Sequence, residues 1–303
     1  MSKTLGSRST TDEVLAGIDL SAKTALVTGS NCGIGFETAQ ALAGAGARVI
    51  FACRNSSSGR DAVERARQRH PDSDVEFGQI DLASVASIKQ FCDALADDTI
   101  DILVCNAGLV STDYKETLEG LELTVGVCHF GHFLLTRLLM PRLLAAKTPR
   151  VVMVSSVSHK SPATLSFERF PLTADNFGTM LAYGQAKLCN VLLANELQRR
   201  YGDQGLTACS LHPGALVTTD IGRGSLWMSV FMKLVSPFTK NVNQGASTTV
   251  FCAVHEESEE VAGKYFSHCA LQPSSREAND PDVAARLWEL SDKWSEKVLG
   301  QGL

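Results

Sequence analysis

Short apolar runs alternate with longer amphipathic stretches along most of the chain. The apolar runs are rich in β-branched residues and are continuous, as in Val151–Val154, which is typical of strands covered on both faces. The stretches between them repeat their apolar residues at the three-to-four spacing of a helix. This alternation predicts βαβ units that assemble into a parallel sheet. We therefore expect a single doubly wound α/β domain.

The same pattern predicts where the elements lie. Strands are expected at 24–28, 47–53, 75–80, 101–105, 150–155 and 206–211. Helices are expected at 33–45, 58–68, 84–96, 118–146, 180–201 and 281–299. Residues 1–22 are polar and are expected to form an N-terminal extension, so the domain would span 23–303, with a less regular region at about 215–245.

Composition excludes several classes of function. The 28 Lys and Arg residues against 33 Asp and Glu residues give a net charge of −5, whereas nucleic-acid partners select a basic surplus. No two of the nine cysteines have Cys-x-x-Cys spacing, so we expect no metal site. No run approaches the roughly 20 apolar residues of a membrane span, and the polar N-terminus lacks a signal-peptide core. We expect a soluble cytoplasmic protein without a nucleic-acid partner.

One apolar stretch stands apart from the predicted elements. Residues 226–235 are mostly apolar but short, and Lys233 interrupts them. A buried helix, a lid over a binding site and a patch for peripheral membrane contact all fit this pattern.

The strongest local motif is TGSNCGIG at 28–35, which follows the first strand and opens the first helix. Gly29 permits a tight turn, and Gly33 and Gly35 let backbone N–H groups approach a pyrophosphate at a helix N-terminus. A purely structural turn is the alternative. We favour a phosphate cradle that also includes Ser30, Asn31 and Ile34.

The second predicted strand is followed by Arg54, at the position where NAD-binding proteins usually place a carboxylate for the ribose hydroxyls. A guanidinium is instead suited to a 2′-phosphate. The alternative is an ordinary exposed arginine. We expect NADP(H) as the cofactor.

The ends of the next two strands carry residues that suit the rest of a dinucleotide. Asp81 and Leu82 follow the third strand, where Asp81 can accept a hydrogen bond from an adenine amino group. Asn106, Ala107 and Gly108 follow the fourth, where Asn106 can fix the turn and Gly108 leaves room for a ribose. Each of these residues could also serve only as a turn former.

Tyr183 and Lys187 are four residues apart, which places them on one face of a predicted helix. A neighbouring cation stabilises a phenolate and lowers the pKa of the phenol, so the tyrosine can act as an acid or base near neutral pH. Ser156, at the end of the fifth strand, can polarise a carbonyl oxygen. A serine there is commonly only a cap, so its interpretation depends on Tyr183.

In this order the motifs resemble the short-chain dehydrogenase/reductase family over nearly the whole chain, from about Lys23 to Leu299. The resemblance rests on TGSNCGIG (28–35), CNAG (105–108), VSS (154–156), YGQAK (183–187) and HPG (212–214). Residues 180–200, 236–240 and 244–253 further resemble the retinol-dehydrogenase-like branch.

The resemblance implies a Rossmann-type fold and an activity. Tyr183 would be the proton donor or acceptor, Lys187 would hold the nicotinamide ribose, and Ser156 would orient the substrate oxygen. The substrate would be a lipophilic alcohol or its ketone or aldehyde, retinoid-like or steroid-like, with 215–245 as the substrate loop. The nicotinamide pocket would be lined by Pro213, Gly214 and Thr218.

Three departures from the family pattern bear on activity. Cys128 stands where the family has Asn, 26 residues separate Ser156 from Tyr183, and Cys32 replaces an alternative basic residue for NADP. Two other functions therefore stay open, a weakened nucleotide-binding regulator acting through protein partners and a general small-carbonyl reductase. No residue decides the oligomeric state.

Three histidines lie near these motifs. His129 and His132 are three residues apart and could suggest a metal site, but no third ligand is evident, so we expect packing or capping roles. His159 follows the fifth predicted strand and could face the pocket, but the default expectation is an exposed loop residue.

Overall fold

The computed structural model describes residues 5–161, 163–213, 241–255 and 258–300. Within these residues one sheet has the strand order β3-β2-β1-β4-β5-β6-β7-β8. All neighbouring strands are parallel except β7 and β8, which are antiparallel. The bounds are β1 Thr24–Thr28, β2 Arg48–Cys53, β3 Val75–Gln79, β4 Ile102–Cys105, β5 Arg150–Val154, β6 Thr207–His212, β7 Tyr265–Ser267 and β8 Ala270–Leu271.

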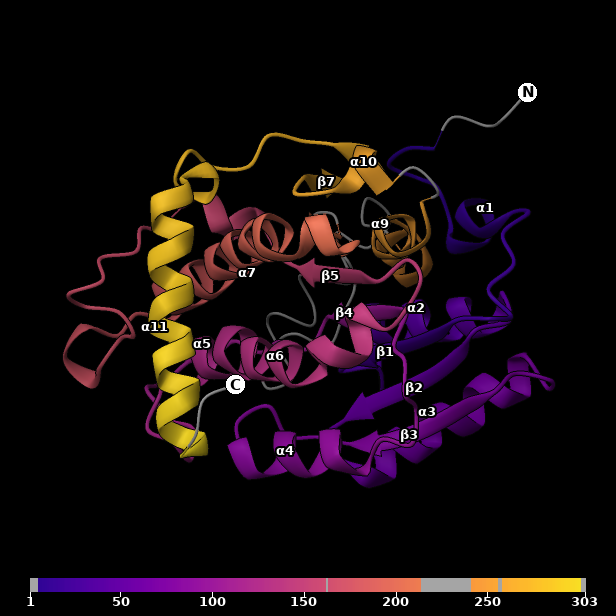
Figure 1. The fold of residues 1–303 in the computed structure, drawn as a ribbon, viewed down its shortest axis with the longest axis horizontal. Coiled ribbons are helices and arrows are strands. Elements are labelled where there is room, and N and C mark those ends of the chain that lie inside the picture. Colours follow the sequence, from indigo (N-terminus) through magenta and orange to yellow (C-terminus); the bar gives the residue numbers. More distant parts are fainter. Residues whose placement is uncertain (1–4, 162, 214–240, 256–257, 301–303) are drawn as a thin grey trace, which may run out of the picture.

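Helices cover both faces of this sheet (Figure 1). One apolar layer packs α2 and α9 against the sheet, and the other packs α4, α6 and α7 against its opposite face. The α-helices are α1 Thr11–Leu15, α2 Gly33–Gly44, α3 Ser56–Arg69, α4 Val85–Ala94, α5 Leu123–Val125, α6 Gly131–Leu144, α7 Thr179–Tyr201, α9 Val242–Val254, α10 Ser258–Val261 and α11 Pro281–Leu299. Shorter turns are the π-helix η1 Gly126–Phe130 and the 3₁₀ helices η2 Val157–Lys160, η3 Ala174–Asn176, η4 Gly202–Gln204 and η6 Glu277–Asn279.

The direction of winding reverses at β1, which pairs with β2 on one side and β4 on the other. In doubly wound sheets, ligands bind at such a point, outside the carboxyl ends of the strands. The predicted doubly wound, Rossmann-type fold is confirmed. The glycine motif after β1 and the turn after β4 therefore meet at this switch point.

Local signals explain several helix starts. Asp280 caps α11 by accepting hydrogen bonds from the N–H groups of Asp282 and Val283, and Pro281 occupies the first helical position. Asn55 caps α3 in the same way through the N–H of Ser58. The expected bounds of the last helix, 281–299, match those of α11.

The expected helix at 118–146 was wrong at its N-terminal end. The α-helical backbone begins at Leu123. The Glu122 carboxylate caps it by accepting hydrogen bonds from the N–H groups of Thr124 and Val125. Gly120 has a positive φ of 78°, which ends any helix before that point. A π-helical turn over Gly126–Phe130 then joins α5 to α6, and such turns often occur at functional sites.

Sequence periodicity also missed helix α9 and several short elements. Helix α1 lies inside the polar extension and packs against α9, while β7 and β8 extend the sheet beyond β6. A capping box of Thr10 and Glu13 marks the start of α1, and this signal was present in the sequence.

Among the described residues, one helical stretch is long and apolar enough to cross a membrane. It runs from Leu123 to Leu144, and 83% of its most apolar window is buried inside the protein. Its apolar character matches its position in the core beside β4 and α4.

Candidate active site

The glycine motif is tied to the turn after β4 through Thr28. The hydroxyl of Thr28 accepts hydrogen bonds from the backbone N–H groups of Asn106 and Ala107, both at 2.9 Å. The Asn106 amide donates to the Thr28 carbonyl at 2.8 Å. Asn106 thus fixes the turn, as expected, and it does so by holding two strand ends together.

The motif leaves no room for side chains at two of its glycines. A Cβ on Gly29, whose φ is 64°, would lie 2.9 Å from the Cα of Ala107. A Cβ on Gly35 would lie 2.4 Å from both the Asn106 amide nitrogen and the Gly29 carbonyl oxygen. These two glycines therefore let the loop pack directly against the turn after β4 at the start of α2, where a helix N-terminus is suited to a pyrophosphate.

Other predicted cradle residues anchor this loop to its neighbours. Ser30 is buried, with its hydroxyl 3.4 Å from the Cys53 sulfur at the end of β2. The Asn31 amide donates to the Ser58 hydroxyl at 3.3 Å. Gly33 has a φ of 57° at the first position of α2, and Ile34 beside it is half-buried.

Arg54 is exposed directly after β2. Its carbonyl accepts from Gln79, and among the described residues its guanidinium has no ion pair. The side chain is therefore available to an anionic ligand near the start of α3. This arrangement fits a 2′-phosphate.

The turn after β3 is more strongly fixed. An Asp81 carboxylate oxygen accepts from the Ala83 N–H at 3.0 Å, and the Asp81 N–H donates to the Ser87 hydroxyl. Leu82 is buried against the start of α6, where a Cβ on Gly131 would meet the Leu82 carbonyl oxygen at 2.4 Å.

Tyr183 and Lys187 lie on α7, where Tyr183 is half-buried and Lys187 is buried. The Lys187 ammonium donates to the Val154 carbonyl at 3.1 Å and lies 5.6 Å from the centre of the Tyr183 ring. The Asn190 amide donates to the same carbonyl at 3.0 Å. One helix face therefore presents a phenol and an ammonium to the end of β5, as the spacing predicts.

Ser156 follows β5 and caps the 3₁₀ helix η2. Its hydroxyl oxygen accepts from the Ser158 N–H at 3.2 Å and donates to the Ser158 hydroxyl at 3.3 Å. Its neighbour Ser155 donates to the Lys187 carbonyl at 2.7 Å, and η2 packs against α7. The structure therefore brings the strand end of Ser156 onto the helix of Tyr183.

Gly108, in the turn after β4, lies close to Lys187 and Cys128. A Cβ placed on Gly108 would lie 3.3 Å from the Lys187 nitrogen and 3.3 Å from the Cys128 sulfur. Cys128 is fully buried in the π-helical turn, and its thiol donates to the Leu109 carbonyl at 3.8 Å. The thiol that replaces the family's Asn therefore lies beside the candidate catalytic lysine.

His132 connects Cys128 to the glycine motif. Its Nδ1 lies 3.0 Å from the Cys128 carbonyl, and its Nε2 lies 2.9 Å from the Thr28 hydroxyl. A carbonyl only accepts, so Nδ1 carries the proton; burial lowers the pKa of His132 to about 4 and keeps the ring neutral. The Thr28 hydroxyl therefore donates to Nε2.

His129 faces a different part of the protein. Its Nε2 lies 2.8 Å from the Ser291 hydroxyl of α11, and burial lowers its pKa to about 3. The described residues contain no group of three metal-ligating side chains. His129 and His132 thus have separate packing partners.

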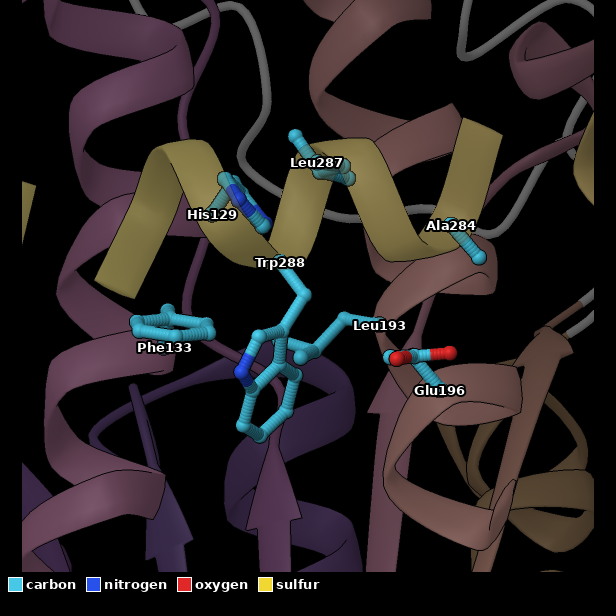
Figure 2. Close-up of a pocket in the computed structure, with 7 residues that line it drawn as sticks. All are labelled: His129, Phe133, Leu193, Glu196, Ala284, Leu287 and Trp288. Atoms are coloured by element: carbon cyan, nitrogen blue, oxygen red, sulfur yellow. The ribbon is translucent and has the colours of Figure 1, made fainter. Parts of the chain in front are cut away.

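His129 also borders a narrow gap between α6, α7 and α11 that is too small to hold a water molecule (Figure 2). The space is mostly apolar, and Trp288 projects from α11 toward Leu193 of α7. Leu193 lies ten residues beyond Tyr183, roughly 15 Å along the helix. This space belongs to helix packing. It is lined by His129, Phe133, Leu193, Glu196, Ala284, Leu287 and Trp288.

The expectation that His159 is an exposed loop residue was wrong. Its side chain is 1% exposed, its Nδ1 lies 2.6 Å from the Ser156 carbonyl, and its Nε2 accepts from the Ser275 N–H. Residues around Ser275 cover it from a distant part of the sequence, which periodicity could not reveal.

The last predicted positions lie around the end of β6. Pro213 is buried directly after this strand. Gly214, Thr218 and the apolar stretch 226–235 lie outside the described residues, as does most of the expected loop at 215–245.

Sequence reasoning missed two residues that hold the site together, Thr28 and Asn190. Thr28 ends β1 with its hydroxyl inside the sheet edge, and Asn190 follows Lys187 by three residues on the same helix face. The helical spacing of Lys187 and Asn190 was a usable signal.

Comparison with known proteins decides the family. Residues 23–168 match the short chain dehydrogenase family. The WW domain-containing oxidoreductase of Gallus gallus is 42% identical over 301 residues, covering 97% of this chain and 73% of that protein. The chain belongs to the short-chain dehydrogenase/reductase family.

Two further relatives extend this result. Retinol dehydrogenase 12 of Mus musculus is 38% identical over 276 residues, covering 90% of this chain and 86% of that protein. The crystal structure of an uncharacterised protein from Mycobacterium paratuberculosis has a TM-score of 0.75 and 32% identity, covering 93% of this chain and 97% of that one. The resemblance to the retinol-dehydrogenase-like branch is confirmed, and the chain is an oxidoreductase of this family.

Proposed function

We propose that the protein is an NADP(H)-dependent oxidoreductase that interconverts a lipophilic alcohol and its ketone or aldehyde. One observation carries the proposal: the buried Lys187 ammonium lies beside the Tyr183 ring and next to Gly108. A buried ammonium that donates to a neutral carbonyl, on the helix face of a half-buried phenol, is suited to proton transfer.

The dinucleotide would lie across the switch point. The backbone around Gly29, Gly33 and Gly35 would hold the pyrophosphate, and Gly108 would leave space for the nicotinamide ribose. The Asp81 carboxylate would accept a hydrogen bond from the adenine amino group. The bound cofactor supplies the hydride, and the protein supplies orientation and the proton.

The chain's own residues handle the proton. In the reductive direction, the Tyr183 hydroxyl gives its proton to the substrate oxygen. The Lys187 ammonium stabilises the phenolate that remains, since an opposite charge favours the ionised form. The Ser156 hydroxyl donates to the substrate oxygen and fixes its position relative to Tyr183.

The preference for NADP(H) rests on Arg54. Its exposed guanidinium follows β2 and has no ion-pair partner among the described residues. A 2′-phosphate would form a charge-assisted pair with it, and no carboxylate follows the strand to receive a ribose hydroxyl.

Two exposed apolar side chains support a lipophilic substrate. Val157 directly follows Ser156, and Met180 precedes Tyr183 by three residues; each is 53% exposed. Apolar surface beside the polar groups of a site favours a lipophilic ligand over a small polar one. The name of the 38% identical relative, a retinol dehydrogenase, points to the same class.

Turnover with a substrate panel tests the proposal. The purified protein would be given retinoids, steroids and simple aldehydes with NADPH or NADH, and cofactor absorbance would be followed. We expect turnover with NADPH and a lipophilic carbonyl. Equal rates with simple aldehydes would indicate a general small-carbonyl reductase. NADPH binding without any turnover would contradict the proposal and favour a nucleotide-binding regulator.

A further inference from the structure

His159 is a buried histidine at the edge of the candidate active site. It lies in η2, three residues after Ser156, and its ring packs on Tyr265 of β7 with ring centres 4.7 Å apart. Nothing in the proton chemistry above uses it. A buried polar ring of this kind requires partners for both nitrogens, because an unpaired one is costly.

Both ring nitrogens of His159 have backbone partners, and these fix its protonation state. Nδ1 lies 2.6 Å from the Ser156 carbonyl, which can only accept. Nε2 lies 3.1 Å from the Ser275 backbone nitrogen, which can only donate. The ring is therefore neutral with its proton on Nδ1, and burial lowers the pKa of His159 in agreement.

Beyond Ser275, further hydrogen bonds reach α7. The Ser275 hydroxyl accepts from the Ala278 N–H at 3.2 Å, and the Ala278 carbonyl accepts from the Asn195 amide at 2.8 Å. Asn195 lies on the helix that carries Tyr183. A series of hydrogen bonds thus runs from the Ser156 backbone, through His159 and the segment after β8, to α7.

The Ser156 side chain itself is held only locally. Among the described residues, its hydroxyl bonds to Ser158 alone, within η2. Its place relative to Tyr183 therefore depends on its backbone. The Ser156 carbonyl accepts a hydrogen bond from the backbone N–H of His159 at 3.1 Å and a second one from Nδ1 of the His159 ring at 2.6 Å.

From this geometry we infer that His159 is a positioning residue, which holds Ser156 in register with Tyr183 through the Nδ1–H bond to the Ser156 carbonyl. This inference rests on the proposed function, in which Ser156 orients the substrate oxygen. Small displacements of an orienting group slow the chemical step while leaving cofactor binding intact.

Three substitutions distinguish the contributions of the two hydrogen bonds made by the His159 ring. In H159N the amide nitrogen replaces Nδ1 and keeps the bond to Ser156. In H159Q the amide oxygen replaces Nε2 and keeps only the bond to Ser275, and H159F keeps only the ring contact with Tyr265. We expect kcat of the Asn variant within about threefold of wild type, and about a 10-fold or larger loss in the Gln and Phe variants. KM for NADPH should be unchanged in all three.

Tyr265→Phe is the matched control. It keeps the ring that packs on His159 and removes a buried hydroxyl that has no hydrogen-bond partner among the residues the structure describes. Its kcat should equal that of wild type. A loss of kcat that is the same in the Asn, Gln and Phe variants would show that the ring only fills space, and would overturn the positioning role.

A second measurement does not depend on turnover. Nitrogen NMR of the histidine-labelled protein, with the His159 signals assigned by their loss in H159N, should show a neutral ring protonated on Nδ1. A proton on Nε2 would overturn the inference. Turnover by wild type with unchanged kcat in H159Q and H159F would contradict only the positioning role, whereas wild type without turnover would contradict the proposed function and this role together.

Discussion

The ammonium of Lys187 donates to the main-chain carbonyl of Val154 at 3.1 Å, from a side chain that is 4% exposed. This bond joins α7 to the last residue of β5, directly before the two serines. The buried charge has a neutral acceptor here and, within the described part of the chain, no carboxylate partner. Its positive charge is therefore not neutralised by a neighbouring carboxylate, and it acts on the Tyr183 ring and on any group that binds beside Gly108.

Tyr183→Phe removes a single hydroxyl from this arrangement. The variant should fold and bind NADPH as wild type does, because the ring and the Lys187 bond are retained. Catalysis should fall by at least about 10²-fold, the usual contribution of a general acid or base. Steady-state kinetics and NADPH titration measure both effects, and near wild-type turnover would falsify the assignment of Tyr183.

Arg54→Asp should shift the cofactor preference from NADP(H) toward NAD(H). The variant loses a charge-assisted contact of about 1.5–3 kcal/mol, and the new carboxylate repels a 2′-phosphate. Fluorescence titration with both cofactors measures the change. Arg60, exposed on α3, offers a control: Arg60→Asp makes the same charge change six residues further along the chain, and it should leave the preference closer to wild type. An unchanged ratio of affinities in the Arg54 variant would contradict its role.

Cys128→Asn restores the residue that the family has in the π-helical turn. A thiol is a poor donor and a weak acceptor, so an amide near Lys187 should support proton transfer by Tyr183 and Lys187 better and raise kcat. KM for NADPH should change little, because proton transfer belongs to the chemical step. The alternative is that Cys128 only packs, and a buried amide without partners would then cost about 1–3 kcal/mol of stability. A lower melting temperature without a gain in kcat would leave only the packing role.

Gly35→Ala tests the glycine cradle. The added Cβ would lie 2.4 Å from the Asn106 amide nitrogen and from the Gly29 carbonyl, so the loop and the turn after β4 must separate. We expect the affinity for NADPH to fall by about 10-fold or more, equivalent to about 1.4 kcal/mol. Gly6→Ala, where a Cβ meets nothing within 4 Å, is the control. Equal affinities for the two variants would contradict the cradle.

Acid should destabilise the protein through its two buried helix histidines. Burial lowers the pKa of His129 to about 3 and of His132 to about 4, from an ordinary value of 6.5. The unfolded chain therefore binds more protons below pH 6.5, and stability is complete above that pH and falls as the pH drops toward 4. Each histidine should contribute a slope of up to about 1.4 kcal/mol per pH unit.

Denaturant unfolding between pH 7 and 4.5 measures this slope. His132→Asn keeps a donor for the Cys128 carbonyl and removes one titrating group, so its unfolding free energy should depend less steeply on pH. His129→Asn should reduce the slope independently. Slopes equal to that of wild type in both variants would show that other groups cause the acid sensitivity.

The sequence predicted the layout of the sheet because each apolar strand and its following helix are local signals. The bounds of α11 followed from Asp280 and Pro281 at its start. Tyr183 and Lys187 could be paired because helical spacing alone places them together. The glycine motif was likewise a local signal, with its strand before it and its helix after it.

Relationships between distant residues were not predictable in this way. His159 is covered by Ser275, which is 116 residues away in sequence, so its burial depends on tertiary packing. The same holds for Thr28 and His132, which are 104 residues apart. The helix expected from residue 118 failed because a polar turn around Gly120 interrupts a stretch with an otherwise helical pattern. Strands β7 and β8, with three and two residues, are too short to show a period.

Helix α11 has a consequence for how the chain folds during synthesis. It covers α7 through Trp288, which packs with Leu193, a residue translated nearly a hundred residues earlier (Figures 1 and 2). At about 5–20 residues per second, this interval lasts roughly 5–20 s. For that time the outer side of the helix that carries Tyr183 stays uncovered on the ribosome. Nascent chains shorter than about 280 residues should therefore present an apolar face to holding chaperones, and the packing around α7 should be completed only after α11 emerges.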